Sequence, residues 1–194
     1  MTAKTLTPRF LLALALVIFG TVLRIVPHPW NFAPVGAVAL FVGAHFERRL
    51  FGILVPLAAM FAGDTALELF TGHGYHALMP VIYATYALIA LLGMTLRGRR
   101  SSVPAVGAGV LASSVLFFVV TNFAVWLWSA TYPKSIAGLA MCYVAGIPFF
   151  GNTLASDALF TAILFGALAA AERRFPSLAP APSVAEGDGI AGAA

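Results

Sequence analysis

The sequence predicts an all-α polytopic membrane protein with six transmembrane helices and both termini in the cytoplasm. Of its 194 residues, 61% are hydrophobic and only 9% are charged, whereas a soluble domain carries about 25% charged residues. The mean hydropathy is +0.95. The apolar residues form runs of the length that crosses a bilayer. The basic residues lie in short groups between these runs, an arrangement that reports membrane topology.

The composition also excludes other classes of protein. So many apolar side chains cannot be hidden inside a 20.3 kDa soluble globule, because a small domain has too much surface for its volume. The single cysteine, Cys142, excludes a disulfide-rich scaffold, and the 16 phenylalanines exclude a disordered chain. The net charge of +4 does not indicate a nucleic-acid partner, because the basic residues form no stripe.

Six apolar runs are long enough to be predicted as helices in the membrane. They cover residues 10–26, 32–46, 50–70, 78–96, 103–128 and 148–171. The second run is short, about 22 Å as a helix, so it is expected either to cross incompletely or to thin the bilayer. Residues 136–146 are apolar but interrupted, and we expect a short helix or loop packed on the outer rim.

The chain is expected to have three regions. These are a cytoplasmic N-terminus (1–9), a six-helix membrane domain (10–171) and a disordered cytoplasmic tail rich in Pro, Ala and Gly (172–194).

The distribution of basic residues predicts the orientation of these helices. With a cytoplasmic N-terminus, nine of the 11 basic residues fall on the inner side: Lys4, Arg9, Arg48, Arg49, Arg97, Arg99, Arg100, Arg173 and Arg174. The other two, Arg24 and Lys134, fall on the outer side. This excess obeys the positive-inside rule.

Polar residues inside the predicted helices are the first candidates for function, because ionisable groups are costly in hydrocarbon. The acidic ones are Asp64, Glu68 and Asp157, and the first two lie four residues apart on one helix face. By helical rise, Asp64 and Asn122 lie about 9 Å from the outer ends of their helices, and Asp157 about 7.5 Å. We therefore expect a polar pocket that opens outward and is shared by three helices.

Histidine and aromatic residues are concentrated in the same outer connections. His28, His73 and His76 fall there, near Tyr83 and Trp126. Such a cluster suits a polar, partly planar molecule that stacks on rings. The predicted substrate-binding residues are His28, Asp64, Glu68, His73, His76, Tyr83, Asn122, Trp126 and Asp157.

Each of these interpretations has a structural alternative. Tryptophans at one interface commonly form an aromatic belt. His28 lies between two prolines and suits an exposed turn, while Asp64 and Glu68 could pair with Arg24 in a structural ion pair. Asn152 is expected to cap the N-terminus of the last helix.

The sequence lacks the motifs of several common kinds of catalytic site. The sequence has no Gly-rich phosphate loop, no His-Glu-x-x-His and no paired cysteines. We therefore expect no enzymatic activity, no cofactor and no dedicated metal site. His73 and His76 are a weak candidate pair for contact with cobalt.

An ordered series of motifs across residues 10–170 resembles a family of uncharacterised bacterial proteins of transport type (DUF6580-like). The motifs are RIVPHPWNFAPVGAVALF (24–41), PLAAMFAGD (56–64), SVLFFVVTNFAVW (114–126), YPK (132–134) and IPFFGNTLASD (147–157). That family is similar to the substrate-binding S components of energy-coupling-factor transporters and to a solitary cobalamin transporter of that type. The resemblance implies an S-component-like bundle and an outward-open vitamin pocket containing His28 and Asp64.

The resemblance also implies a choice of partners. The protein would either share an energy-coupling-factor ATPase module or act alone. The cobalamin transporter binds cobalt through a cysteine near the outer end of its third helix. Here Cys142 lies in a later segment, and His73 or His76 could offer a nitrogen ligand instead.

The sequence thus predicts an uptake transporter, or a substrate-capture subunit, in the bacterial cytoplasmic (inner) membrane. Its expected partners are the lipid bilayer and a small vitamin-like substrate, with cobalamin as a candidate by resemblance, and not nucleic acid. The second hypothesis is a non-transporting membrane scaffold or assembly protein whose polar residues form a structural network. A proton-coupled carrier is not expected, because the inner halves of the helices lack acids.

Overall fold

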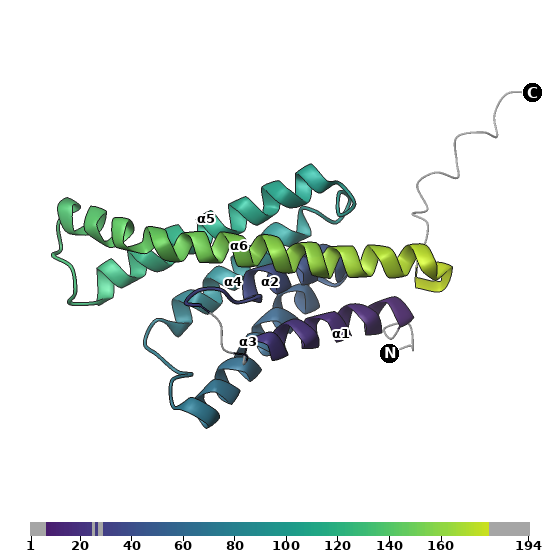
Figure 1. The fold of residues 1–194 in the computed structure, drawn as a ribbon, viewed down its shortest axis with the longest axis horizontal. Coiled ribbons are helices and arrows are strands. Elements are labelled where there is room, and N and C mark those ends of the chain that lie inside the picture. Colours follow the sequence, from purple (N-terminus) through teal and green to yellow (C-terminus); the bar gives the residue numbers. More distant parts are fainter. Residues whose placement is uncertain (1–6, 25, 27–28, 179–194) are drawn as a thin grey trace, which may run out of the picture.

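The computed structural model describes residues 7–24, 26 and 29–178, and this part of the chain is all-α, as predicted (Figure 1). It contains six α-helices and a short 3₁₀ turn. They are α1 (Pro8–Leu23), α2 (Val35–His45), α3 (Arg49–Thr71), α4 (Met79–Met94), α5 (Val103–Trp128), α6 (Ile136–Arg174) and η1 (Pro176–Leu178).

Successive helices run in alternating directions between two ends of the molecule (Figure 1). The terminal end holds the connections 46–48 and 95–102 together with both ends of the described chain. The distal end holds the connections 72–78 and 129–135 and the residues 29–34 that lead into α2. Because the six helices alternate in direction, the first and last described residues lie at the same end of the molecule.

Helix α2 is the centre of the fold. It contacts each of the other five helices, and these form a ring in the order α1, α3, α4, α5, α6. All of its 11 residues are buried, as expected for a helix that is apolar on every side. Because protein surrounds it on all sides, this helix of about 16 Å does not have to match a bilayer. The predicted helix 32–46 is thus a short central helix.

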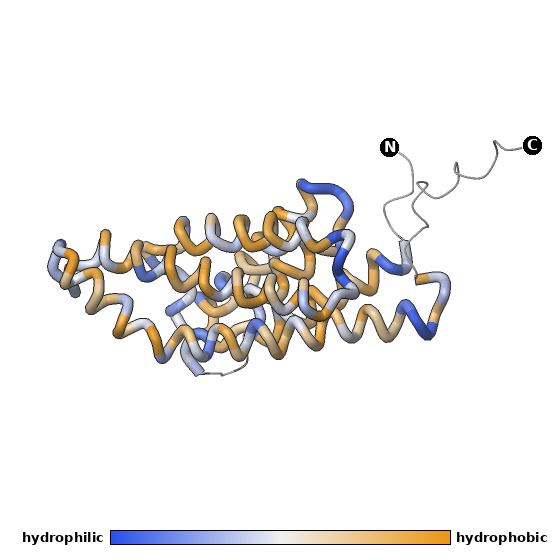
Figure 2. The backbone as a smooth tube through the Cα atoms, turned by 90° about the horizontal axis from the view of Figure 1, so that it is seen from above, coloured by the Kyte–Doolittle hydropathy of each residue, from blue (hydrophilic) through white to orange (hydrophobic). Residues whose placement is uncertain are grey.

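Within the described part of the chain, three helices are long and apolar enough to cross a membrane, namely α3, α5 and α6, with 23, 26 and 39 residues. Their outward faces are covered by large apolar side chains. Leu69 on α3, for example, is 79% exposed, and Ile136 on α6 is 89% exposed. Along the tube in Figure 2 the helices are mainly hydrophobic, and the most hydrophilic stretches lie in connections and near helix ends. Apolar surface of this extent is typical of membrane proteins rather than of soluble monomers.

The expectation of a separate segment at residues 136–146 is wrong. These residues are the start of α6, which continues through Pro148 to Arg174. Pro148 lacks an N–H and so removes one hydrogen bond within the helix, but packed apolar helices tolerate such a loss. At about 58 Å, α6 is longer than the ~30 Å hydrocarbon core, so part of it projects beyond that core.

Other boundaries shift by a few residues. Helix α1 ends at Leu23 rather than at residue 26. Helix α3 ends where Gly72 takes a left-handed conformation (φ 67°), which glycine adopts without steric cost. The predicted tail from 172 begins within α6, and its residues 179–194 lie outside the described residues.

Candidate functional site

A cavity of about 380 Å³ lies at the distal end between α4, α5 and α6. Ligand pockets usually measure about 300–1,000 Å³. Its aromatic lining is Trp30, Phe117, Phe118, Tyr132, Phe149 and Phe150. Its polar lining is Asn31, Thr121, Asn122 and Thr153, with the thiol of Cys142. The distal cavity therefore combines stacking surfaces with a few hydrogen-bonding groups, and none of the described residues in its lining is charged.

Asn122 is the most versatile polar group of the distal cavity. Its side-chain Nδ2 donates to the Phe118 carbonyl oxygen (2.8 Å). The backbone carbonyl oxygen of Asn122 accepts from the Cys142 thiol (3.3 Å). No partner for its Oδ1 is found among the residues described. A Cβ added at Gly146 would approach this Oδ1 to 2.5 Å, so glycine is what makes room for the amide. Asn122 Oδ1 is thus available to accept a hydrogen bond from a ligand.

Trp126 does not line this cavity, although the sequence placed it in the site. Its Nε1 donates to the Pro133 carbonyl oxygen (2.9 Å). Lys134 Nζ donates to the carbonyl oxygens of Trp126 and Ser129. These bonds fix the 129–135 connection, which brings Tyr132 to the cavity. Trp126 therefore contributes to the cavity only indirectly, by holding the connection that carries Tyr132.

Asp64 and Tyr83 belong to a separate polar group. Arg24 donates to Asp64 Oδ1 through Nε (3.1 Å) and through Nη2, and the Tyr83 hydroxyl donates to Asp64 Oδ2 (2.8 Å). Asp64 is 2% exposed. The ion pair of the structural alternative is therefore present. Glu68 is not part of it, because its Oε2 accepts from the backbone N–H groups of Gly74 (2.9 Å) and Tyr75 (3.1 Å).

Asp157 is buried between α6, α5 and the N-terminus of α2. Its Oδ2 accepts from the Ser114 hydroxyl (2.7 Å), and the carboxylate is hydrogen-bonded by the backbone of Ala37. Gly36 lies against the same carboxylate, where a Cβ would clash. Helix α2 has no side-chain cap from its own flanking residues. Asp157 therefore caps the central helix from α6, in the position where a carboxylate is stabilised by the helix dipole.

Two neighbours on α6 hold the segment that enters α2. The Asn152 amide donates to the Trp30 carbonyl oxygen (2.9 Å), and the Ser156 hydroxyl donates to the Ala33 carbonyl oxygen (2.8 Å). The expectation that Asn152 caps the last helix is wrong, since α6 begins 16 residues earlier at Ile136 with Ser135 as its cap. The role of Asn152 is to connect distant segments.

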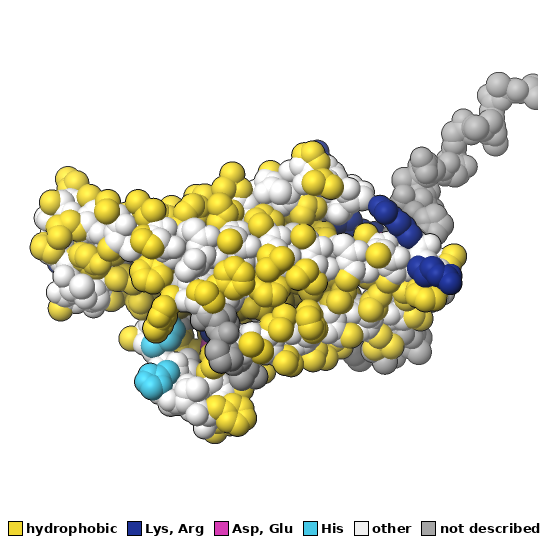
Figure 3. All heavy atoms as spheres, in the orientation of Figure 1, with side chains coloured by type: hydrophobic (Ala, Val, Ile, Leu, Met, Phe, Trp, Pro, Cys, Tyr) yellow, Lys and Arg dark blue, Asp and Glu magenta, His cyan; other side chains and the backbone are white. Residues whose placement is uncertain are grey.

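Among the residues that the structure describes, neither Asp64 nor Asp157 joins Asn122 in the lining of the distal cavity. Asn122 lines the distal cavity, whereas each acid has its own partners in the protein. His73 and His76 lie exposed in the 72–78 connection, at the distal side where Figure 3 shows histidine in cyan. His28 lies outside the described residues. Within the described ranges, no group of three or more potential metal ligands comes together.

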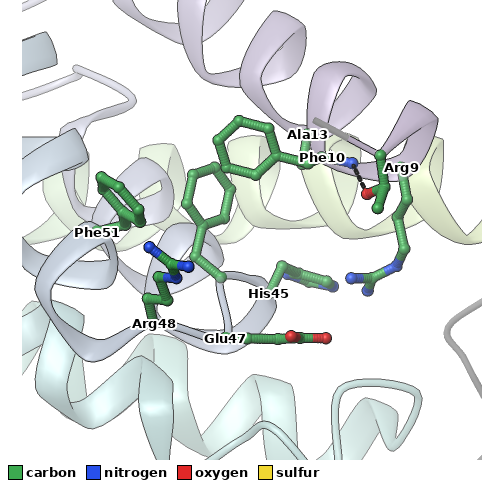
Figure 4. Close-up of a pocket in the computed structure, with 9 residues that line it drawn as sticks. Arg9, Phe10, Ala13, His45, Glu47, Arg48 and Phe51 are labelled. Atoms are coloured by element: carbon green, nitrogen blue, oxygen red, sulfur yellow. Dashed lines mark hydrogen bonds between the residues drawn. The ribbon is translucent and has the colours of Figure 1, made fainter. Parts of the chain in front are cut away.

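A second pocket, of about 250 Å³, lies at the terminal end (Figure 4). Its polar lining lies beside the rings of phenylalanines and consists of Thr7, Arg9, His45, Glu47 and Arg48. His45 is buried, and its Nδ1 lies 2.9 Å from the Phe41 carbonyl oxygen. The size of this pocket falls below the usual range for ligands. We therefore take the distal cavity as the candidate site, because it combines ligand size with several polar groups.

Sequence reasoning missed most of the distal cavity. Phe118, Tyr132 and Cys142 line it, but in the sequence they look like ordinary apolar or loop residues. Ser114 was equally hidden, since a serine in an apolar helix commonly bonds to its own backbone. Among the described residues of the predicted site, Asn122, an amide within an apolar run, is the one that the structure places in the cavity.

Residues 4–178 match a family described as "Family of unknown function (DUF6580)". The chain belongs to this family. The matched region includes all six helices and the distal cavity. For this DUF6580 protein, no curated protein and no solved structure gives a match.

Proposed function

We propose that this DUF6580 protein is a membrane uptake transporter, or a substrate-capture subunit of one, that binds a small molecule in the distal cavity. The observation that supports this most is the cavity itself. It is of ligand size, it is walled by rings from α5 and α6, and it presents the free acceptor of Asn122.

The lining favours a neutral ring compound with at least one hydrogen-bond donor. Ring faces such as Phe118 and Phe149 stack on planar ligands. Because the described part of the cavity lining is uncharged, a charged ligand would lose its hydration there without a compensating partner. The volume lies near the lower end of the usual range, which favours a vitamin-sized monocyclic or bicyclic compound over a macrocycle such as cobalamin.

The proposed orientation puts the distal end outside the cytoplasm. Eight described basic residues lie at the terminal end: Arg9, Arg48, Arg49, Arg97, Arg99, Arg100, Arg173 and Arg174. Two lie at the distal end, Arg24 and Lys134. This imbalance favours a cytoplasmic terminal end. We further propose six passes through the bacterial inner membrane in an S-component-like arrangement, with or without an energy-coupling ATPase module.

The test begins with the purified full-length protein. Co-purifying small molecules are identified by mass spectrometry, and a panel of vitamins that includes cobalamin is screened by thermal shift. We expect a neutral ring compound to bind. Asn122→Ala should weaken its binding about tenfold, the value of roughly 1.4 kcal/mol for a lost hydrogen bond. Gly151→Ala is the matched control, because a Cβ at this position on α6 meets nothing within 4 Å.

The scaffold hypothesis is favoured by a different observation. Asp64 and Asp157, the two acids deepest in the protein, are engaged by protein groups. A scaffold would show no co-purified ligand, no thermal shift with the panel, a stable protein partner after mild extraction, and no effect of Asn122→Ala on that partner. This set of results would replace the capture proposal.

A further inference from the structure

A groove of about 610 Å³ runs between α5 and α6 at the terminal end, away from the distal cavity. Apart from Thr161, its deep lining is apolar and includes Val110, Leu154 and Phe165. Gly107 on α5 and Gly166 on α6 face open space in the groove, since a Cβ at either position would meet nothing within 4 Å. The groove is thus an open, mainly apolar surface depression between two long apolar helices.

The mouth of this α5–α6 groove is positively charged. Arg100 and Arg173 line it, and in the described ranges neither guanidinium group has an ion pair or a side-chain hydrogen bond. The neighbouring acid Glu172 is already paired with Arg9 (2.8 Å). Burial, and then the nearby charge of Arg9, lower the pKa of the Arg100 guanidinium, while the more weakly acting Glu172 and Glu47 carboxylates raise it. Figure 3 shows basic side chains gathered at this end beside an apolar surface.

The dimensions of the groove match one leaflet of a bilayer. Its lining on α5 extends from Val103 to Leu111, about 12 Å along the helix, and on α6 from Leu154 to Ala169, about 22 Å. Half of the ~30 Å hydrocarbon core lies between these lengths. The charged mouth is at the level where α5 begins and α6 ends, which is where headgroups lie.

We propose that the α5–α6 groove binds an anionic phospholipid of the surrounding bilayer. Its phosphate lies between Arg100 and Arg173, and one acyl chain follows the groove past Gly107 and Gly166. Guanidinium groups bind phosphate through paired, charge-assisted hydrogen bonds. Basic pockets between transmembrane helices commonly hold such headgroups. This inference does not depend on the ligand of the distal cavity.

The test counts bound lipids on the full chain in mild detergent by native mass spectrometry. The protein is offered equal amounts of phosphatidylglycerol and phosphatidylcholine. We expect wild type to retain several-fold more phosphatidylglycerol, and Arg100→Gln with Arg173→Gln to bring the ratio close to one. Gly166→Leu should reduce retention of both lipids, because it fills the groove. Gly151→Leu, also at an open glycine of α6 but outside the groove, should behave as wild type.

Three results would overturn the inference. One is equal retention of the two lipids by wild type, and another is an unchanged preference in the folded double arginine variant. The third is a stable dimer that protects Cys residues introduced at 107 or 166, which would mean that a second copy covers the groove. If the arginine variants do not fold, wild type in 1 M salt serves instead. Its preference must then fall, since salt screens the headgroup attraction.

Discussion

Asp157 lies at the point where α6, α5 and the first turn of α2 meet, and both of its polar neighbours are buried. A carboxylate is suited to this place, because it accepts the Ser114 hydroxyl and a backbone N–H that α2 cannot satisfy itself. At the residue scale the buried acids thus act as structural connectors. Their substitution should affect folding before it affects binding.

We expect Asp157→Ala to lower the free energy of unfolding by about 2–4 kcal/mol, because two buried donors lose their acceptor. Asp157→Asn should cost less, since its amide can accept from the Ala37 backbone and donate to Ser114. Thermal unfolding in detergent measures both variants. A folded Asp157→Ala protein of wild-type stability that no longer binds ligand would place this acid in the functional site.

Tyr83→Phe tests the second polar group. This substitution removes the hydroxyl that donates to the Asp64 carboxylate (2.8 Å). It should lower the free energy of unfolding by about 1.5 kcal/mol, the lower value for a hydrogen bond to a charged acceptor. Tyr75→Phe is the control, because the Tyr75 hydroxyl pairs with Thr65 on the exposed surface. We expect the control to stay within about 0.5 kcal/mol of wild type. Equal losses for the two variants would contradict this account.

At the scale of elements, α2 depends on its neighbours at both ends. Asp157 caps its N-terminus, and Arg97 binds three carbonyl oxygens at its C-terminus, those of Gly43, Phe46 and Glu47 (3.1, 2.7 and 3.1 Å). A cation at the C-terminus also complements the helix dipole. An isolated helix of 11 residues is marginal in water, so its stability here comes from the ring of five helices.

The crossing of α2 and α4 depends on two glycines. A Cβ at Gly43 would meet the backbone of Ala90, and one at Gly93 would meet the backbone of Leu40 (3.0 Å). Because the obstacle is backbone, Gly43→Ala and Gly93→Ala should each destabilise by about 1–3 kcal/mol. Gly151→Ala, with open space around it, should instead stabilise by a few tenths to about 1 kcal/mol, measured in the same unfolding assay. The same sign for all three would refute the close crossing.

The whole molecule has two ends that differ in charge, and this difference predicts how it sits in the membrane. A cysteine at position 131 in the distal 129–135 connection should react with a membrane-impermeant maleimide in spheroplasts. One at position 98 in the terminal 95–102 connection should react only after lysis. Cys142→Ser provides the background. Reversed labelling would invert the proposed orientation, and labelling of both positions before lysis would rule out six passes.

The sequence alone determined the features that depend on composition and local pattern. The all-α class, the long apolar helices and the approximate bounds of α3 and α5 follow from runs of apolar residues. Asn122 stood out because an amide is rare in an apolar run. These signals are local, so one sequence is enough to show them.

Only the tertiary structure decided which polar groups meet. Asp64 and Asp157 look alike in sequence, but Arg24 and Tyr83 come to one of them, and Ser114 with the α2 N-terminus to the other. The distal cavity likewise depends on ring positions from separate helices. The continuity of α6 through Pro148 and the central position of α2 were hidden for the same reason. Each results from packing between segments far apart in the chain, and hydrophobic periodicity shows that a helix is buried but not what buries it.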